Sequence, residues 1–307
     1  MDKISKILPE PGPWHHEYAP AAWLCVRGED AFSFLQGQFT QDLRSSKPQP
    51  ARYGLWLNQK GRVLADSFSL CISLKEIWLH SYFSPAATIR ERLESYIVAD
   101  DVTIEDHTAE GRALTLGGGA AAALMGTAAV ALPAPGEFAR IGEGFIFGGR
   151  RGGADTWEWV GLGMRPPAGG LDVSTEEMLR LRLEAGVPAV PVDLGPGDLP
   201  NEGGLEDVAI SYTKGCYLGQ EVMARLRSMG RVRRRLRRVR GPGLPPPERP
   251  APLFQGGKRI GELRSAVADG ARGWAGLAML GLTGLGPAEP LGLAPEGGAE
   301  IQIVDTV

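Results

Sequence analysis

Cys216 has surroundings that could make a thiol reactive. It lies in the segment SYTKGCYLGQE, residues 211–221, close to Lys214 and just before a helical pattern over residues 218–230. A nearby positive charge and the unpaired N–H groups of a helix N-terminus both stabilise a thiolate. Such a thiolate would be nucleophilic, redox-active or metal-binding. The spacing fits equally well with the alternative that Cys216 is a small buried hydrophobic residue.

The other cysteines do not form a recognisable framework with it. Cys25, Cys71 and Cys216 are odd in number and widely spaced, which fits neither a disulfide framework nor a CxxC zinc site. The N-terminal segment lacks the apolar core of a signal peptide. We therefore expect a reducing, cytoplasmic environment.

No metal-binding or nucleotide-binding motif can be recognised in the chain. The glycine cluster LGGGAAA, residues 116–122, is followed by neither the Gly-Lys-Ser/Thr of a P-loop nor a GxGxxG turn. Two adjacent histidines fall in a proline-rich N-terminal segment that we expect to be mobile, and the other two are isolated. These histidines are His15, His16, His80 and His107.

Length and charge exclude several classes of protein. A chain of 307 residues with 43% hydrophobic content can bury a core in two or three lobes. A formal net charge of −3 gives no overall attraction to nucleic acid or to a membrane. The apolar stretch 114–135 is rich in glycine and alanine and contains proline, so we expect a buried strand and helix there and no membrane partner.

The elements that position these residues form an α+β pattern of antiparallel strands. A strand, a turn at Gly28 and an amphipathic helix are followed by a hairpin at NQKG, residues 58–61. A second hairpin follows, and then a helix within residues 84–98 with Ser84 as its expected N-cap. The segment 111–170 repeats this theme of strands and one alanine-rich helix.

The last part of the chain is expected to be a separate domain. Residues 174–186 form the clearest helix pattern, with a capping box of Ser174 and Glu177 and a stop at Gly186. The proline-rich run 240–252 is typical of a linker. Short strands after it indicate a small C-terminal β-barrel. The predicted regions are 1–110, 111–170, 171–235 and 236–307.

Several segments resemble the YgfZ family of folate-binding proteins, relatives of the glycine-cleavage T protein, an aminomethyltransferase. KGCYLGQE is similar to the family signature, and the resemblance extends to FLQGQFTQDL, to LNQKGRVLADSFSL and to the stretch 181–225. The resemblance implies a three-lobed cloverleaf around a tetrahydrofolate pocket. It also implies a role in making or repairing iron–sulfur clusters, including those of tRNA-modifying enzymes, with iron–sulfur proteins or assembly factors as partners.

In that family the signature cysteine is required for function. The resemblance therefore implies that Cys216 is a working thiol that faces the folate cavity. The signature loop around it consists of Lys214, Gly215, Tyr217, Gly219, Gln220 and Glu221.

Three residues are candidates for binding the folate. Similarity to the T protein places a pterin-binding glutamate near Glu158 and a folate-contacting tyrosine at Tyr53, and a carboxylate can accept the adjacent N–H donors of a pterin. Arg182, or the arginines after Cys216, could bind the glutamate tail. The alternatives are an exposed strand residue for Glu158, a plain core residue for Tyr53 and a solvated helix residue for Arg182.

Asp66 distinguishes two hypotheses for function. The T protein has Gly-Gly-x-x-Asp-Asp in this hairpin, whereas this chain has GRVLAD, and Asp66 aligns with the second, catalytic aspartate. A carboxylate there could stabilise a cationic iminium or orient the pterin amine. The chain could thus be a folate-dependent aminomethyltransferase instead of a cluster-assembly protein, or a folate-binding scaffold without chemistry. Asp66 could also be a solvent-facing strand residue.

Nine arginines lie between Arg225 and Arg240. Three aliphatic residues interrupt them, which favours a half-buried strand with a basic outer face. The alternative is a docking patch for RNA, polyglutamyl folate or an acidic partner, without base-specific contacts.

Overall fold

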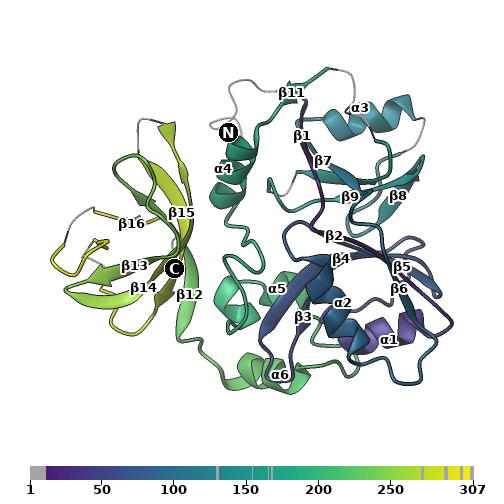
Figure 1. The fold of residues 1–307 in the computed structure, drawn as a ribbon, viewed down its shortest axis with the longest axis horizontal. Coiled ribbons are helices and arrows are strands. Elements are labelled where there is room, and N and C mark those ends of the chain that lie inside the picture. Colours follow the sequence, from purple (N-terminus) through teal and green to yellow (C-terminus); the bar gives the residue numbers. More distant parts are fainter. Residues whose placement is uncertain are drawn as a thin grey trace.

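The computed structural model describes residues 12–128, 131–153, 155–164, 166, 169–270, 273–286, 290–297 and 300–304. Two sheets lie together in the right half of Figure 1, a third sheet lies at the left, and helical segments connect them. The chain therefore has the α+β architecture expected from its antiparallel patterns.

The first sheet is antiparallel, with strand order β3-β4-β5-β2-β6. Both expected hairpins are present in it, at residues 58–62 and 74–75. Its strands are β2 (Ala22–Arg27), β3 (Ala51–Leu57), β4 (Val63–Ser73), β5 (Glu76–Ser81) and β6 (Thr103–Asp106).

The two faces of the first sheet bury different partners. Along β3, Trp56 packs with the helices α1 (Ala31–Gln38) and α2 (Ala86–Glu94), whereas Tyr53 and Leu55 belong to a separate core on the other face. Successive strand residues point to opposite faces, so one strand contributes to both cores. The helices thus cover one face, and the other face is left for the second sheet.

The second sheet has the strand order β11-β1-β7-β10-β9-β8. The helix α3 (Ala120–Thr127) packs on it, so the apolar stretch 114–135 begins with a strand end and a short helix as expected. Among the described residues no helix has the length and apolarity needed to span a membrane. The strands are β1 (Trp14–Tyr18), β7 (Arg112–Gly117), β8 (Phe138–Ile141), β9 (Gly144–Gly148), β10 (Trp157–Gly161) and β11 (Leu171–Asp172).

The N-terminal histidines lie in an ordered strand, so the expectation of a mobile segment there was wrong. β1 contains His15 and His16 and is bonded on both sides, to β7 and to β11. His16 is buried, and its Nδ1 lies 2.7 Å from the carbonyl oxygen of Val173. Local composition does not reveal this pairing, because the partner strands lie about a hundred or more residues later in the chain.

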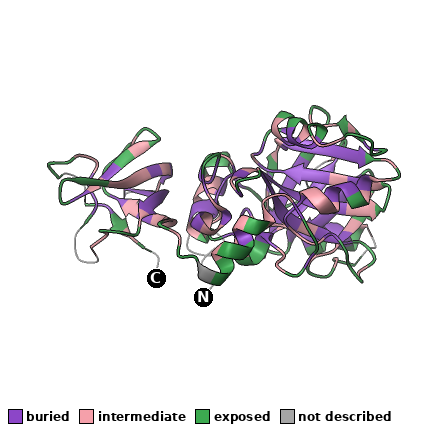
Figure 2. Cartoon of the chain, turned by 90° about the horizontal axis from the view of Figure 1, so that it is seen from below, coloured by how far each residue is buried: buried purple, intermediate pink, exposed green. Residues whose placement is uncertain are grey.

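The two sheets share a core rich in aromatic residues. Phe68 of β4 lies 4.8 Å from Phe147 of β9, and Trp23 of β2 lies 5.9 Å from Phe145 of β9, measured between ring centroids. Figure 2 shows the buried residues concentrated along the strands of these two sheets. Any polar side chain placed between the sheets is therefore withdrawn from water.

The helix α4 (Thr175–Ala185) confirms the predicted capping box. Ser174 Oγ accepts the N–H of Glu177, and the Glu177 side chain accepts the N–H of Ser174 at 2.9 Å. Gly186 ends the helix with a φ of +69°, in the left-handed region that favours glycine. After α4 the chain forms a 3-10 turn η2 (Pro200–Gly203), α5 (Glu206–Ala209) and α6 (Gln220–Met229).

The C-terminal sheet curls into a half-barrel with strand order β13-β14-β15-β12-β16. Isolated bridges between Phe254 and Gly292 and between Leu291 and Ile301 continue the pairing beyond the sheet edges. The proline-rich run is a loop between β12 and β13 of this same sheet, so the expectation of a linker ahead of the domain was wrong. The strands are β12 (Arg234–Gly241), β13 (Ala251–Gln255), β14 (Lys258–Ala268), β15 (Trp274–Gly281) and β16 (Gln302–Ile303).

Candidate functional site

Asp66 lies on β4 with its carboxylate buried between the sheets. The hydroxyl of Tyr53 donates to Oδ2 at 2.8 Å, and the hydroxyls of Ser81 and Ser84 donate to Oδ1 at 3.0 and 2.6 Å. Burial raises the pKa of Asp66, and these hydrogen bonds oppose the rise. Only 3% of the residue is exposed, so the alternative of a solvent-facing strand residue is excluded.

Ser84 was expected to cap a helix but instead holds Asp66. The helix α2 begins at Ala86, with Pro85 at its N-cap. The Ser84 hydroxyl accepts the backbone N–H of Asp66 at 2.9 Å and also contacts the carboxylate. A buried carboxylate depends on such donors because it has no water to replace them, whereas the first turn of α2 can remain without a side-chain cap.

Glu158 lies on β10 and is completely buried. Tyr18 and Thr115 donate to its Oε2 at 2.7 and 3.0 Å, and Tyr82 donates to its Oε1 at 3.0 Å. Burial raises the pKa of Glu158 to about 7 despite these hydrogen bonds. The carboxyl group can therefore gain or lose a proton near neutral pH, and the alternative of an exposed strand residue is excluded.

Tyr53 belongs both to the aromatic core and to the polar site. Its ring lies 5.2 Å from the ring of Phe68, and its hydroxyl reaches Asp66. The guanidinium carbon of Arg150 lies 4.2 Å from the ring centroid of Tyr53. The two expectations for Tyr53, as a core residue and as an aromatic wall beside the site, are thus compatible.

Arg150, Arg151 and His80 also lie at this site, although the sequence pattern indicated no role for the two arginines and His80 was expected to be isolated. Arg151 lies 4.6 Å from the Tyr18 ring centroid, and His80 Nε2 lies 3.1 Å from the Tyr18 hydroxyl. Burial lowers the pKa of His80 to about 3, so its ring is neutral. The signal that could have identified the arginines is the pair of adjacent cations in GGRRGG, residues 148–153, just before β10.

Polar atoms of these three residues are buried without a hydrogen-bond partner among the described residues. The atoms are Nε of Arg150, Nη1 of Arg151 and Nδ1 of His80. Buried polar atoms are nearly always paired in folded proteins, so such a group indicates a place where a ligand or water would bind. The site thus combines two carboxyl groups, which can accept N–H donors, with aromatic rings and two guanidinium groups. This combination suits a flat heterocycle with amino groups, such as a pterin.

Lys214 of the signature loop binds the end of α1. Its Nζ donates to the backbone carbonyl oxygens of Gln36 at 2.6 Å, Phe39 at 2.7 Å and Gln41 at 3.2 Å. Cations stabilise the free carbonyls at a helix C-terminus. The ammonium group therefore anchors the loop to α1, which is a different contact from the thiolate pairing expected from the sequence.

Backbone geometry fixes the second half of the loop. Gly219 precedes α6 with a φ of +87°, and a Cβ there would lie 3.1 Å from the carbonyl oxygen of Asn58. Tyr217 is buried in the shared core. Gln220 and Glu221 form the first turn of α6, and Glu221 is exposed. The loop thus packs against the tip of the β3-β4 hairpin.

The thiol of Cys216 is exposed at the surface of the loop, as is Gly215. The alternative of a small buried hydrophobic residue is therefore excluded. The position three residues before the N-cap of α6 agrees with the expected helix start.

Arg182 is buried and already paired. Its Nη1 donates to Asp193 Oδ2 at 2.5 Å and to the carbonyl oxygen of Val187 at 2.8 Å. Its guanidinium carbon lies 5.5 Å from the ring centroid of Phe83, which also contacts Arg151. Arg182 thus lies next to the polar site and is not a solvated helix residue.

The arginine-rich stretch covers α6 and β12, and several of its charges are paired within the chain. Arg234 binds Asp198 at 3.0 Å and Glu202 at 2.9 Å. Arg240 binds Glu184 of α4. These pairs attach β12 to the preceding helical segment, in agreement with the half-buried strand that the sequence favoured.

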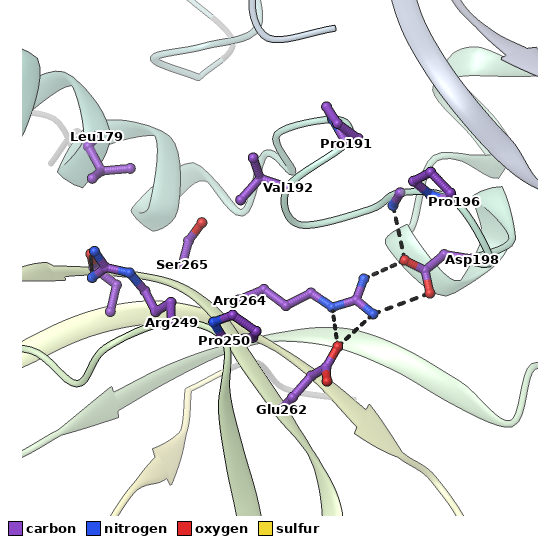
Figure 3. A pocket seen from close by; sticks show the side chains of 12 residues that line it. Leu179, Pro191, Val192, Pro196, Asp198, Arg249, Pro250, Glu262, Arg264 and Ser265 are labelled. Carbon is purple, nitrogen blue, oxygen red and sulfur yellow. Dashed lines mark hydrogen bonds and ion pairs between the residues drawn. The ribbon is translucent and has the colours of Figure 1, made fainter. Parts of the chain in front are cut away.

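A cleft of about 510 Å³ separates the C-terminal sheet from residues 191–198. Figure 3 shows Arg264 of β14 crossing it to hydrogen-bond Asp198, with Glu262 on its other side. Pro191 and Val192 form the opposite wall. The charges in the cleft largely satisfy one another, so we assign it a role in holding the C-terminal sheet in place.

Among the residues in the described ranges, no three or more His, Cys, Asp or Glu side chains come together as a metal site would require.

Comparisons with known proteins agree with this geometry. A family model described as the GCVT N-terminal domain matches residues 19–138. The human protein named iron-sulfur cluster assembly factor IBA57, mitochondrial, is 31% identical over 265 residues, which cover 72% of this chain and 67% of the human protein. The mouse protein of the same name is 28% identical over 295 residues, which cover 84% of this chain and 78% of the mouse protein.

The fold is also found in a solved structure. The glycine cleavage system aminomethyltransferase T from Bartonella henselae superposes with a TM-score of 0.77, covering 99% of this chain and 88% of that protein. The sequence identity is 18%, so this likeness concerns the fold. The identity to IBA57 shows that the chain belongs to the YgfZ-like family that includes IBA57, and the structural likeness shows that it has the T-protein fold.

Proposed function

We propose that the protein binds tetrahydrofolate between its first two sheets and assists the assembly or repair of iron–sulfur clusters, including those of tRNA-modifying enzymes. The observation that carries the folate part is the pair of buried carboxyl groups, Asp66 and Glu158, beside arginine atoms that lack partners. The name of the IBA57 relatives supports the cluster part.

Glu158 is the proposed acceptor for the pterin. Its Oε1 receives one hydroxyl in the described structure, which leaves a lone pair for a ligand N–H. Tyr53 would line the ring, with its hydroxyl kept in place by Asp66. A bound tetrahydrofolate would supply a one-carbon carrier, and the protein residues would hold it and exclude water.

The glutamate tail of the folate needs a cation. We assign this role to Arg150 before Arg182, because the Arg182 guanidinium is bound to Asp193 whereas Nε of Arg150 has no partner among the described residues. Arg182 would then contribute by positioning Phe83 and the turn that follows α4.

Cys216 is the proposed working thiol, and its exposure determines what it can reach. A thiol at the surface is accessible to a second protein. We therefore propose that Cys216 acts on an iron–sulfur protein or assembly factor that docks at the signature loop, and that Lys214 keeps this loop in place on α1.

A second candidate is aminomethyl transfer with Asp66 as the catalytic group. The T-protein fold and the position of Asp66 on β4 favour it. Three hydroxyls hold the Asp66 carboxylate, the same number as hold Glu158, so one lone-pair site remains on each and the hydrogen bonds alone do not separate the two candidates.

Complementation separates the two candidates. A strain that lacks its own member of the family would receive the wild type, Cys216→Ala or Asp66→Asn, and the activity of an iron–sulfur enzyme would be measured in extracts. We expect Cys216→Ala to fail and Asp66→Asn to keep most of the activity. Loss of activity only in Asp66→Asn would instead support aminomethyl transfer, and full activity in Cys216→Ala would remove the working thiol.

A further inference from the structure

Arg151 is a buried cation at the folate site with an unused hydrogen-bond donor. Only 8% of the residue is exposed. Its guanidinium carbon lies 4.6 Å from the ring centroid of Tyr18, 5.1 Å from that of Phe83 and 5.9 Å from that of Tyr82. Among the described residues its Nη1 has no hydrogen-bond partner. The aromatic rings therefore hold the guanidinium in position, and both N–H groups of Nη1 lack an acceptor among the described residues.

The same two tyrosines connect Arg151 to Glu158. Tyr18 and Tyr82 contact the guanidinium with their rings and donate their hydroxyls to the Glu158 carboxylate. Arg151 also acts on Glu158 through its charge, while Nη1 of Arg151 has no hydrogen-bond partner among the described residues. Tyr18 and Tyr82 thus hold both an acceptor with one free lone pair and a cation whose Nη1 is unused among the described residues.

This arrangement complements one edge of a pterin. A 2-amino-4-oxopterin presents the 2-amino group, the N3–H group and the 4-oxo oxygen in a row, so two donors are followed by one acceptor. The free lone pair on Glu158 Oε1 can accept one of the two donors, and a guanidinium N–H can donate to the oxygen. We propose that Arg151 donates from Nη1 to the 4-oxo group of the bound folate and makes the site selective for 4-oxo over 4-amino pterins.

The inference rests on the proposed folate binding and adds a specificity-determining residue to it. A 4-amino group is a hydrogen-bond donor, so it would face the Arg151 N–H with another N–H. A site whose buried donor is left without an acceptor rejects the wrong ligand strongly.

A second arginine that contacts an aromatic ring provides a control for Arg151. Arg140 of β8 also lies over an aromatic ring, with its guanidinium carbon 5.8 Å from the centroid of Phe145, but its residue is exposed. Arg140→Met is therefore a matched control that removes a cation from an aromatic ring without touching the polar site.

The test uses two ligands that differ at the 4-position and in the hydrogen on N3, which only the 4-oxo ring carries. Folic acid carries the 4-oxo group and aminopterin carries a 4-amino group, and each would be titrated by calorimetry into the full-length wild type, Arg151→Met and Arg140→Met. We expect the wild type to prefer folic acid by about tenfold or more, since a hydrogen bond to a charged group contributes on that scale. Arg151→Met should lose much of this preference by binding folic acid more weakly without weaker binding of aminopterin, and the contact of Glu158 with N3–H accounts for what remains. Arg140→Met should keep it.

The outcomes separate this inference from the proposed function. If the wild type binds neither folic acid nor 5-formyltetrahydrofolate, folate binding itself is refuted. If the wild type binds folic acid but shows no preference over aminopterin, or if Arg151→Met weakens both ligands equally, the role of Arg151 is refuted and folate binding stands. Should Arg151→Met fail to fold, the preference of the wild type and of Arg151→Lys still decides the question.

Discussion

Replacing Glu158 by Gln should change how the stability of the protein depends on pH. Burial raises the pKa of Glu158 from 4.5 to about 7. Between these pH values the folded protein holds a proton that the unfolded chain has released, so the free energy of unfolding falls as the pH rises. A glutamine has no such proton, so the variant lacks this contribution.

The expected size follows from the rise in pKa. At about 1.36 kcal/mol for each pKa unit, the change from 4.5 to about 7 corresponds to about 3 kcal/mol. Buried His80 contributes with the opposite sign, because its pKa is lowered to about 3 and its contribution to stability grows as the pH rises toward 6.5. Both proteins contain His80, so this contribution largely cancels when their free energies are subtracted.

Urea denaturation followed by tryptophan fluorescence measures the effect. The free energy of unfolding of the wild type minus that of Glu158→Gln should fall by about 3 kcal/mol between pH 4.5 and pH 8. Glu91→Gln, a change of an exposed glutamate on α2, controls for the loss of one charge. A difference between wild type and Glu158→Gln that stays constant with pH would refute the assignment of Glu158 as a buried acid with a raised pKa.

Two further predictions concern the signature loop. Lys214→Met removes the three hydrogen bonds to the end of α1 and should lower the free energy of unfolding by roughly 3 kcal/mol. Lys60 is exposed, so Lys60→Met should change the free energy of unfolding by less than about 0.5 kcal/mol. Equal urea midpoints for the two variants would contradict the anchoring role of Lys214. Cys216 should react with iodoacetamide before Cys25, because Cys216 is exposed and burial raises the pKa of Cys25 to about 12; peptide mapping that finds Cys25 modified first would contradict this.

Local patterns predicted the local structure well. The capping box of α4 and the two hairpins of the first sheet involve residues a few positions apart, so their sequence signals are nearly complete. The arginine-rich stretch was also correctly interpreted as containing a half-buried strand, β12, because aliphatic residues interrupt its charges.

The partners of the site residues could not be predicted in the same way. Lys214 binds carbonyl groups that lie 173 to 178 residues earlier in the chain, although Cys216 is only two residues away. Glu158 receives a hydroxyl from Tyr18, 140 residues before it. Such contacts arise when separate strands pack together, so a single sequence identifies the residue types but not the pairs they form.

Direct titration of a folate tests the central claim most simply. Calorimetry with 5-formyltetrahydrofolate should show saturable binding to one site in the wild type, and Glu158→Gln should bind roughly tenfold more weakly or worse, because a hydrogen bond to a charged group is lost. No binding to the wild type at near-millimolar ligand, or an unchanged affinity in Glu158→Gln, would contradict the account.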